Sequence, residues 1–307
     1  MQNFFEILPE KNNTAIALGF FDGIHKGHRN VLSLAVDEKQ NGLTAVCFTF
    51  SENPKNVINN AQSCALMTEC DKIKTLDMLG IDHTYQADNR KIMNMSAKTF
   101  VKEILIDTLK AKKLFCGFNY RFGKNGEGNV EMLRSLCDEY GIEVTVVPPE
   151  ESNGTVVSST LIRNLIAEGD VKTANKLLCG KFGFCSEIEH GKKLGRELGT
   201  PTINQPLYPQ LVTPAFGVYA SAVTLENGKV YCGVTNIGIK PTVGGKVPLS
   251  ETWMPTFDGG EIYGQKADVR LLEFIRPEKK FSGIEELKNA IIDNGKTALK
   301  IFENEYR

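Results

Sequence analysis

The sequence GFFDGIHKGH, residues 19–28, is the stretch that decides how the first part of the chain folds. It follows the apolar run TAIALGF (14–20) and precedes RNVLSLAVDEKQNG (29–42). The apolar residues of the later segment recur at helical spacing and Gly42 closes it, so the order predicts a strand, a tight glycine turn and a helix N-terminus. At such a junction the backbone N–H groups and the helix dipole bind phosphate.

Two of the four histidines of the chain fall in this turn. His25 and His28 lie one helical turn apart and share a face, so both can donate to the same anion. Gly19, Gly23 and Gly27 remove the side chains that would keep a nucleotide away from the backbone. The alternative is a glycine turn with incidental surface histidines.

The complete pattern is similar to the HxGH signature with which the nucleotidyltransferase superfamily binds the triphosphate of ATP. In its longer form, Gly-x-Phe-Asp-Gly-x-His-x-Gly-His, it resembles the bacterial bifunctional riboflavin kinase/FAD synthetases. The resemblance implies that His28 is catalytic and that several residues of the turn contact the phosphates of ATP. These residues are Gly19, Phe20, Asp22, His25, Gly27 and His28.

Length, charge and cysteine usage narrow the class of protein. A chain of 307 residues is long enough for about two domains, and a formal net charge of −1 gives no reason to expect nucleic acid or an acidic membrane as a partner. The eight cysteines form no CxxC pair and no cysteine–histidine cluster with zinc spacing. Because the sequence shows no charged-then-apolar leader and no apolar run near ~18 residues, we expect a cytosolic, reduced protein without a membrane span.

Strand-like and helix-like segments alternate through the first half of the chain. This alternation predicts an α/β domain over residues 1–180, with a parallel sheet covered by helices on both faces. The resemblance makes it a Rossmann-like nucleotidyltransferase domain. In such sheets ligands bind beyond the carboxyl ends of the strands, so the turns that follow strands are candidate sites.

The turn TFSENP (49–54) resembles a segment on the nucleotide side of the family, usually Thr-Phe-Asp-Pro-His-Pro. Ser51, Glu52 and Asn53 replace three of those residues. A plain exposed turn at the end of a strand is an equal interpretation, and no role is assigned to these residues.

The segment GFNYRFGKNGEGN (117–129) resembles the family's Gly-x-(Asp/Asn)-Phe-x-Phe-Gly segment, with Tyr120 in the first phenylalanine position. Aromatic rings beside an amide suit a flat isoalloxazine ring. We therefore expect Asn119, Tyr120 and Phe122 to contact the flavin. The alternative is a glycine-rich hairpin whose aromatic rings serve only as packing.

The segment VVSSTLIRNLIAEGD (156–170) resembles the superfamily's Ser-Ser-Thr-x-x-Arg element, which closes over the leaving pyrophosphate. Helix capping alone explains one serine, but it does not explain an arginine in the first helical turn. Hydroxyls, free N–H groups and a guanidinium suit a leaving diphosphate. Ser159, Thr160 and Arg163 are therefore expected to bind it, with Arg163 catalytic.

The pattern changes in residues 181–307, where short alternating runs are separated by glycine and proline turns. This pattern predicts a small antiparallel β-barrel, and Asn227-Gly228 between two runs is a strong hairpin signal. The final stretch, 283–307, predicts a helix that packs on the barrel. Its expected buried face comprises Ile284, Leu287, Ile291 and Ile292.

The segment GKKLGRELGTPTIN (191–204) resembles the riboflavin kinase segment Gly-x-x-x-Gly-x-x-x-Gly-x-Pro-Thr-Ala-Asn. The resemblance implies that Gly195 and Thr202 contact the phosphates of ATP. It also implies that oxygens of Thr202 and Asn204 hold Mg²⁺, an ion that prefers hard oxygen ligands.

The segment GVTNIGIKPT (233–242), with Lys240 where arginine is usual, and the later Glu251 complete the resemblance to riboflavin kinases. By that resemblance Glu251 is the general base that takes the proton from the ribityl 5′-hydroxyl, provided it lies within hydrogen-bond reach. A surface strand glutamate is the alternative.

Two motif sets, in the order that the family has them, span nearly the whole chain. The resemblance implies a bifunctional enzyme that phosphorylates riboflavin with ATP to give FMN, then adenylylates FMN to FAD with release of pyrophosphate. Its partners would be riboflavin, FMN and ATP, with flavin a substrate and not a bound redox cofactor.

Three alternatives stay open. The chain could be another adenylyltransferase, such as one acting on pantetheine phosphate or nicotinate mononucleotide, although that leaves the barrel motifs unexplained. It could be a non-enzymatic flavin-binding regulator, although that predicts the loss of Glu251 or His28. It could also have lost one activity, which the departures at residues 51–53 would place in the N-terminal half.

Overall fold

The structure, a computed structural model, describes residues 2–4, 8–52, 64–92, 94–190, 199–242 and 245–306. The chain separates into two compact units. The first comprises Met1–Ser63 and Glu69–Ser159, and the second comprises Cys64–Thr68 and Thr160–Arg307. The boundary expected between residues 180 and 181 stays a prediction.

The first unit is built on a sheet of strand order β1-β4-β3-β2-β5-β6, and every neighbouring pair is parallel. The strands are β1 (Gln2–Phe4), β2 (Thr14–Leu18), β3 (Thr44–Phe50), β4 (His83–Ala87), β5 (Ala111–Gly117) and β6 (Glu143–Val147). The central strands β2 and β3 are almost entirely buried, as continuous apolar runs in a sheet covered on both faces should be. The predicted parallel α/β sheet is confirmed.

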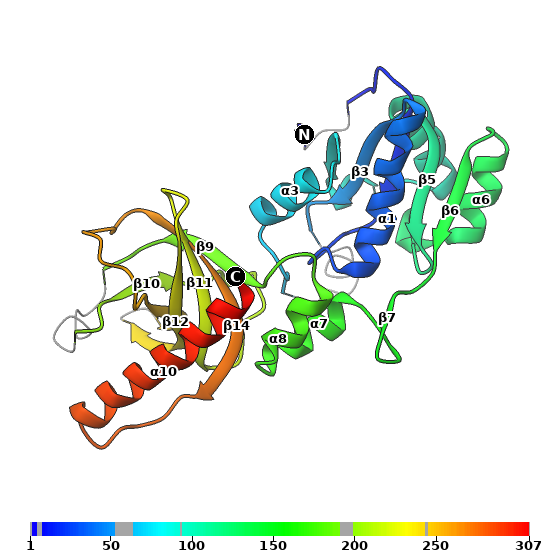
Figure 1. Ribbon diagram of the computed structural model, residues 1–307. Coiled ribbons are helices and arrows are strands. Elements are labelled where there is room, and N and C mark those ends of the chain that lie inside the picture. Colours follow the sequence, from blue (N-terminus) through cyan, green and yellow to red (C-terminus); the bar gives the residue numbers. More distant parts are fainter. Residues whose placement is uncertain are drawn as a thin grey trace. The chain divides into compact units, whose positions relative to one another are not determined.

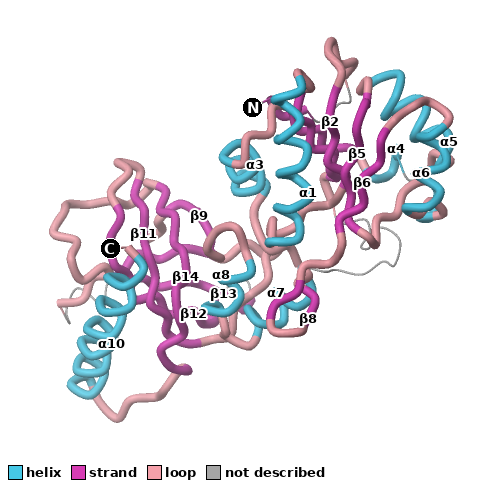
Figure 2. Tube along the Cα trace, turned by 45° about the vertical axis from the view of Figure 1, so that its right-hand side comes forward, coloured by secondary structure: helices cyan, strands magenta, loops and turns pink. Residues whose placement is uncertain are grey.

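Helical segments cover the two faces of this sheet, with α1 and α3 on one side and α5 and α6 on the other (Figure 2). They are α1 (Lys26–Asp37), a 3₁₀ turn (Glu38–Asn41), α3 (Glu69–Met78), α4 (Asn89–Ile92), α5 (Ala97–Thr99), a π-helix (Phe100–Thr108), a second 3₁₀ turn (Lys124–Gly126) and α6 (Val130–Asp138). The main core contains the fully buried side chains of Ile16, Leu18, Val46, Phe48, Phe100, Leu105 and Leu133.

The helix expected near residues 96–109 is present, but most of it is a π-helix and not an α-helix. After one short α-helical turn the chain continues as a π-helix, and the N–H of Leu109 donates to the carbonyl of Ile104, five residues back, at 2.9 Å. Such segments are rare and concentrate at functional sites.

The second unit contains a sheet of strand order β10-β13-β12-β11-β14-β9, and every neighbouring pair is antiparallel (Figure 1). The strands are β9 (Gly183–Glu187), β10 (Thr202–Pro206), β11 (Gly217–Leu225), β12 (Val230–Thr242), β13 (Gly245–Trp253) and β14 (Lys266–Pro277). The helices are α7 (Ser159–Ala167), which starts at the last residue of the first unit, α8 (Val171–Leu177) and α10 (Ile284–Glu305). A two-strand hairpin of β7 (Glu151–Ser152) and β8 (Thr155–Val156) belongs to the first unit.

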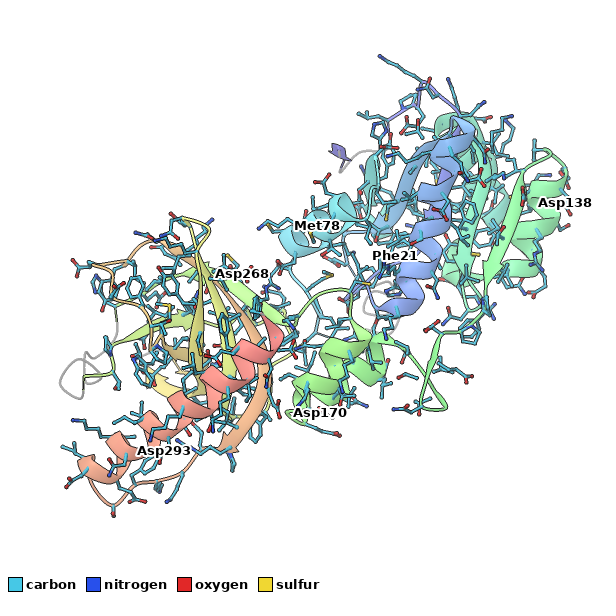
Figure 3. All side chains as sticks on the ribbon, viewed as in Figure 1. Phe21, Met78, Asp138, Asp170, Asp268 and Asp293 are labelled. Atoms are coloured by element: carbon cyan, nitrogen blue, oxygen red, sulfur yellow. The ribbon has the colours of Figure 1, made fainter. Side chains whose placement is uncertain are left out.

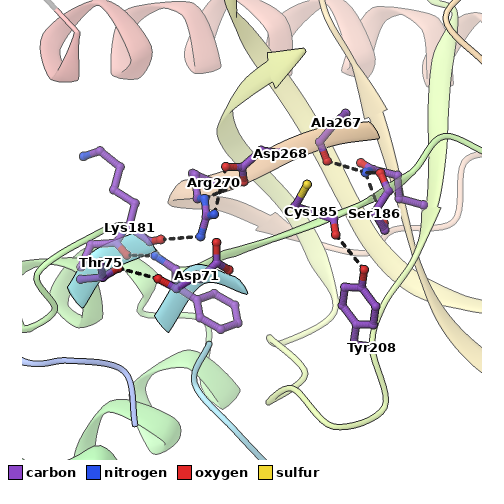
Figure 4. A network of polar contacts seen from close by, with 12 residues as sticks. Asp71, Thr75, Lys181, Cys185, Ser186, Tyr208, Ala267, Asp268 and Arg270 are labelled. Atoms are coloured by element: carbon purple, nitrogen blue, oxygen red, sulfur yellow. Dashed lines mark hydrogen bonds and ion pairs between the residues drawn. The ribbon is translucent and has the colours of Figure 1, made fainter. Parts of the chain in front are cut away.

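The end strands of this second sheet, β9 and β10, approach each other and nearly close it into a barrel. The side-chain amide of the fully buried Gln205 on β10 donates to the carbonyls of Ser186 and Ala267, each at 2.8 Å (Figure 4). The backbone N–H of Glu189 donates to the carbonyl of Asn204 at 2.8 Å. The predicted small antiparallel barrel with a C-terminal helix is confirmed.

Helix α10 packs on the outside of the barrel, as expected, but through a different face. Ile284 is 69% exposed, whereas Asn294, Gly295 and Ala298 are buried. The prediction of a buried stripe starting at Ile284 is therefore wrong. A Cβ atom on Gly295 would lie 2.7 Å from the ring of Trp253, so the helix backbone contacts the barrel through its small residues.

Candidate active sites

The turn between β2 and α1 has an unusual backbone conformation. Phe21 and Ile24 have φ angles of 55° and 40°, and Gly23 between them has a φ of 80°. Positive φ is costly for a β-branched residue such as Ile24, and such strain concentrates at functional sites. A Cβ on Gly19 would lie 2.9 Å from the ring of Phe21, so only glycine fits there.

Polar side chains from outside the turn hold its carbonyl groups. The carbonyl of Phe20 accepts hydrogen bonds from the hydroxyl of Thr49 and from the ammonium of Lys72, both at 2.8 Å. The carbonyl of Asp22 accepts from the hydroxyl of Ser159 at 3.0 Å. The turn is therefore fixed by residues of β3 and α3 and by Ser159, and not by its own sequence alone.

His25 and His28 stack on each other at the start of α1, with ring centroids 3.6 Å apart and planes 18° apart. His25 is the N-cap residue of the helix, and its Nδ1 accepts a hydrogen bond from the backbone N–H of His28. That acceptor role places the ring hydrogen of neutral His25 on Nε2. The Nδ1 atom of His28 is buried without a hydrogen-bond partner among the described residues.

Both histidines are neutral at ordinary pH because they are removed from water. Burial lowers the pKa of His25 from 6.5 to about 4. The pKa of His28 is lowered well below its usual value, first by burial, then by repulsion from His25 when that ring is protonated, and then by Lys72. The ring of Phe21, the residue labelled beside α1 in Figure 3, contacts His28 edge to face, with ring centroids 5.4 Å apart, and contributes to this apolar surrounding.

Lys72 and Thr49 are functional candidates that the sequence motifs do not indicate. Both side chains are buried. The ammonium of Lys72 donates a hydrogen bond to the carbonyl of Phe20 and lies 4.6 Å from the centre of the Phe20 ring. One signal was present in the sequence. Lys72 stands four residues before the buried Leu76 and so falls on the inward face of its helix.

The aromatic residues of the expected flavin segment are buried in the core. Tyr120 and Phe122 stack at 5.8 Å, with 8% and 4% of their surface exposed, whereas Asn119 is exposed. This burial fits the packing interpretation of the two rings. The hydroxyl of Tyr120 is nevertheless buried without a hydrogen-bond partner among the described residues, and burial raises its pKa. A flavin contact of these residues stays a prediction.

Arg163 and Thr160 belong to the second unit, unlike Ser159. The guanidinium of Arg163 donates through Nε to the carbonyl of Cys64 at 2.6 Å, and Thr160 is exposed. Their part in phosphate binding stays a prediction. Asn53 and Gly195 lie outside the described residues.

In the second unit three candidate residues form a row across adjacent strands. Glu251 on β13 pairs with Asn204 on β10 on one side and with Asn236 on β12 on the other. Directly paired residues point to the same face of a sheet, so the expected metal ligand, the expected base and a second amide are neighbours. Asn236 falls in the motif GVTNIGIKPT, but the motif alone gave it no role.

Thr202 lies two residues before Asn204 on β10 and therefore points to the same face. Its hydroxyl and the amide oxygen of Asn204 are hard oxygen donors, the kind that Mg²⁺ prefers. The hydroxyl of nearby Thr200 is buried without a partner among the described residues. This donor set fits a magnesium ion bound with phosphate oxygens.

Comparison with known proteins gives two family matches on the two parts of the chain. Residues 7–161 match the family described as FAD synthetase, and residues 178–302 match the family described as riboflavin kinase. The bifunctional riboflavin kinase/FMN adenylyltransferase of Listeria monocytogenes is 35% identical over 280 residues, which cover 90% of this chain and 88% of the relative. The protein of that name from Bacillus subtilis is 33% identical over 304 residues, which cover 97% of this chain and 95% of the relative.

This chain belongs to the bifunctional riboflavin kinase/FMN adenylyltransferase family. A solved structure from Streptococcus pneumoniae, titled a macrolide-efflux protein, has the same fold, with a TM-score of 0.87, 28% identity and coverage of 96% of this chain and 97% of that one. Among the residues that the structure describes, no helix is long and apolar enough to cross a bilayer. The family membership matches the fold and both motif sets, and it removes the alternatives of another adenylyltransferase and of a regulator.

Proposed function

We propose that the two activities of the family are divided between the two matched regions of this chain. Riboflavin kinase activity, which produces FMN, belongs to residues 178–302, and FMN adenylyltransferase activity, which produces FAD, belongs to residues 7–161. The observation that carries this division is that each region contains its own set of motif residues. The stacked histidines lie in the first unit, and the Asn204–Glu251–Asn236 row lies in the second.

In the adenylyltransferase reaction, a phosphate oxygen of FMN bonds to the α-phosphorus of ATP, and the bond to the pyrophosphate oxygen breaks. The FMN phosphate is already a nucleophile at neutral pH, so positioning and charge stabilisation suffice. Neutral His25 and His28 donate N–H groups to the α-phosphate and the leaving group. Gly19, Gly27 and the N-terminus of α1 let the triphosphate approach the backbone.

Further contacts in the adenylyltransferase reaction follow from the motifs, and one of them, Arg163, lies two residues beyond the matched region. Ser159, Thr160 and Arg163 bind the leaving pyrophosphate, and Asn119 with Tyr120 and Phe122 contacts the flavin. The hydroxyl of Tyr120, buried without a hydrogen-bond partner among the described residues, supports a polar contact that becomes available when substrate binds.

In the kinase reaction, the ribityl 5′-oxygen of riboflavin bonds to the γ-phosphorus of ATP, and ADP leaves. Glu251 accepts the proton of that hydroxyl, and Asn236 beside it orients the carboxylate or the substrate. Thr202 and Asn204 would hold Mg²⁺, which when bound neutralises charge on the ATP phosphates. The cytosolic location expected from the sequence stays a prediction.

The test is to incubate the purified protein with riboflavin, ATP and Mg²⁺ and to separate the flavins by chromatography over time. We expect FMN first and FAD later. FMN without FAD would refute the adenylyltransferase assignment and direct attention to the departures at residues 51–53. No product under aerobic or reducing conditions would refute both assignments.

A further inference from the structure

Lys72 is a charged residue buried in the first unit that the mechanism above does not use. Only 7% of its surface is exposed, and it lies on the first turn of α3. Its ammonium donates to the carbonyl of Phe20 at 2.8 Å and to the hydroxyl of Thr49 at 3.2 Å, and lies 4.6 Å from the ring centre of Phe20.

Both oxygens that accept from Lys72 are uncharged. Burying an ammonium costs several kcal/mol of free energy, which neutral acceptors offset only in part. Burial accordingly lowers the pKa of Lys72, while Cys47, Asp22 and Glu69 raise it. A neutral side chain would pack α3 at a lower cost in free energy. The charge of Lys72 therefore has a role other than stabilising the fold.

The position of Lys72 indicates that use. Phe20 precedes the strained residues Phe21 and Ile24, and its carbonyl is the group that Thr49 and Lys72 hold together. The charge of Lys72 also reaches His28, because it contributes to lowering the pKa of that ring. The side chain of Lys72 thus fixes the conformation of the proposed phosphate-binding turn and makes the electrostatic potential there more positive.

We propose that Lys72 is a positioning residue of the adenylyltransferase site, which holds the carbonyl of Phe20 and supplies one positive charge next to the phosphate-binding turn. The inference rests on the proposed function, in which this turn binds the ATP phosphates. Lys72 acts through the turn and makes no contact with substrate. Its contribution increases as negative charge develops on the α-phosphate and the leaving group.

The test compares Lys72→Met, which removes both the charge and the donors, with Lys74→Met on the same helix. Lys74 is exposed, so its variant controls for a lost lysine on α3. We expect Lys72→Met to lower kcat for FAD formation by about 10²-fold, because a shift of the turn misplaces the groups that bind the phosphates. The amount of FMN bound per protein, the KM for FMN and the kinase activity of the same sample should be unchanged.

A second pair of variants separates the hydrogen bond from the charge. Lys72→Gln keeps an N–H donor without a charge and should lose less activity than Lys72→Met. Thr49→Val removes the other donor to Phe20 and should also lose less. The proton resonances of His28 should titrate at a higher pH in both Lys72 variants and be unchanged in Lys74→Met, a signature that a loss of folded protein would not produce.

The outcomes distinguish this inference from the proposed function. If the wild-type protein forms FMN but no FAD, the adenylyltransferase assignment fails and this inference with it. If the wild type forms FAD and Lys72→Met does so within about threefold, only the role of Lys72 is refuted. If Lys72→Met loses FAD-forming activity only in proportion to its loss of FMN-binding capacity, Lys72 is purely structural, and the inference is refuted.

Discussion

In the proposed adenylyltransferase reaction, His25 and His28 act as uncharged donors because the turn keeps them away from water. The hydrogen bond from the backbone N–H of His28 fixes the tautomer of His25, and their stacking orients both rings. A neutral imidazole gives a directed hydrogen bond to phosphate without the repulsion of two adjacent positive charges. The same burial makes the first unit sensitive to acid.

We expect the free energy of unfolding to fall as the pH falls from about 6.5 to about 4. Because burial lowers the pKa of His25 from 6.5 to about 4, the unfolded chain binds a proton in that range that the folded chain does not. Each such histidine contributes a slope of about 1.4 kcal/mol per pH unit. Denaturant unfolding in a series of buffers would measure it. His25→Asn keeps an N-cap acceptor but does not titrate, so an equal slope in that variant would contradict the assignment.

Glu251 is the residue on which the kinase proposal depends most. We expect Glu251→Gln to slow FMN formation by about 10²-fold or more, because the amide cannot accept the hydroxyl proton. Conversion of added FMN to FAD should continue at the wild-type rate. Glu187→Gln, at an exposed glutamate of β9, is the matched control and should keep both rates. Riboflavin phosphorylation at a normal rate would remove Glu251 from the mechanism.

At the scale of secondary-structure elements, the pairing of strands β9 and β14 depends on a close contact between their backbones. Gly183 on β9 pairs with Arg270 on β14, and a Cβ on Gly183 would lie 2.0 Å from the carbonyl oxygen of Val269. The neighbouring ion pair between Arg270 and Asp268 lies on the same part of β14 (Figure 4). The edge of the barrel therefore depends on a glycine that no sequence motif marks.

We expect Gly183→Ala to lower the free energy of unfolding by roughly 1–3 kcal/mol, the range for overpacking. Thermal unfolding would measure the change. Gly180→Ala is the matched control, because a Cβ there meets no atom of the described residues within 4 Å. Equal stability of the two variants would show that β9 can shift to admit a methyl group.

Much of the fold could be predicted at this scale, and the reasons for success and failure differ by element. Buried parallel strands such as β2 and β3 read as apolar runs, and Gly228, with a φ of 78°, marks the expected hairpin between β11 and β12. The π-helix at Phe100–Thr108 carries no sequence signal, because its apolar spacing is also that of an α-helix. The buried face of α10 was misassigned because small residues, not large apolar ones, approach Trp253.

The candidate sites could be predicted only where a family motif marks them. Motifs predict His25, His28, Asn204 and Glu251. The structure adds that the two histidines stack and that Asn204 and Glu251 are paired across adjacent strands. The spacing to Leu76 puts Lys72 on the inward face of its helix, but a lysine is expected on the surface, and its contacts are what establish its burial.

At the scale of the whole molecule, the stacked histidines lie in one compact unit and the Asn204–Glu251–Asn236 row lies in the other, and each unit has its own core. The product of one proposed reaction is the substrate of the other. Two variants that each lack one of the two activities should therefore complement each other through free FMN.

We expect His28→Ala to convert riboflavin to FMN only, and Glu251→Ala to convert FMN to FAD only. A mixture of the two variants should convert riboflavin to FAD after a lag in which FMN accumulates in solution, because FMN must leave one molecule and bind another. Chromatography of the flavins over time measures the lag. Loss of both activities in either single variant would contradict two separate sites.

Because Cys64–Thr68 belongs to the second unit, the chain passes between the units after residues 63, 68 and 159. Ala65 donates to the carbonyl of Gln210 at 2.7 Å and accepts from the N–H of Val212 at 2.9 Å. A single proteolytic nick after residue 159 would therefore leave two fragments that are still joined by the bridge between Ala65 and Leu211. In two copies of the chain, the same segment can pair with residues 210–212 of the other copy, which is a route to domain exchange.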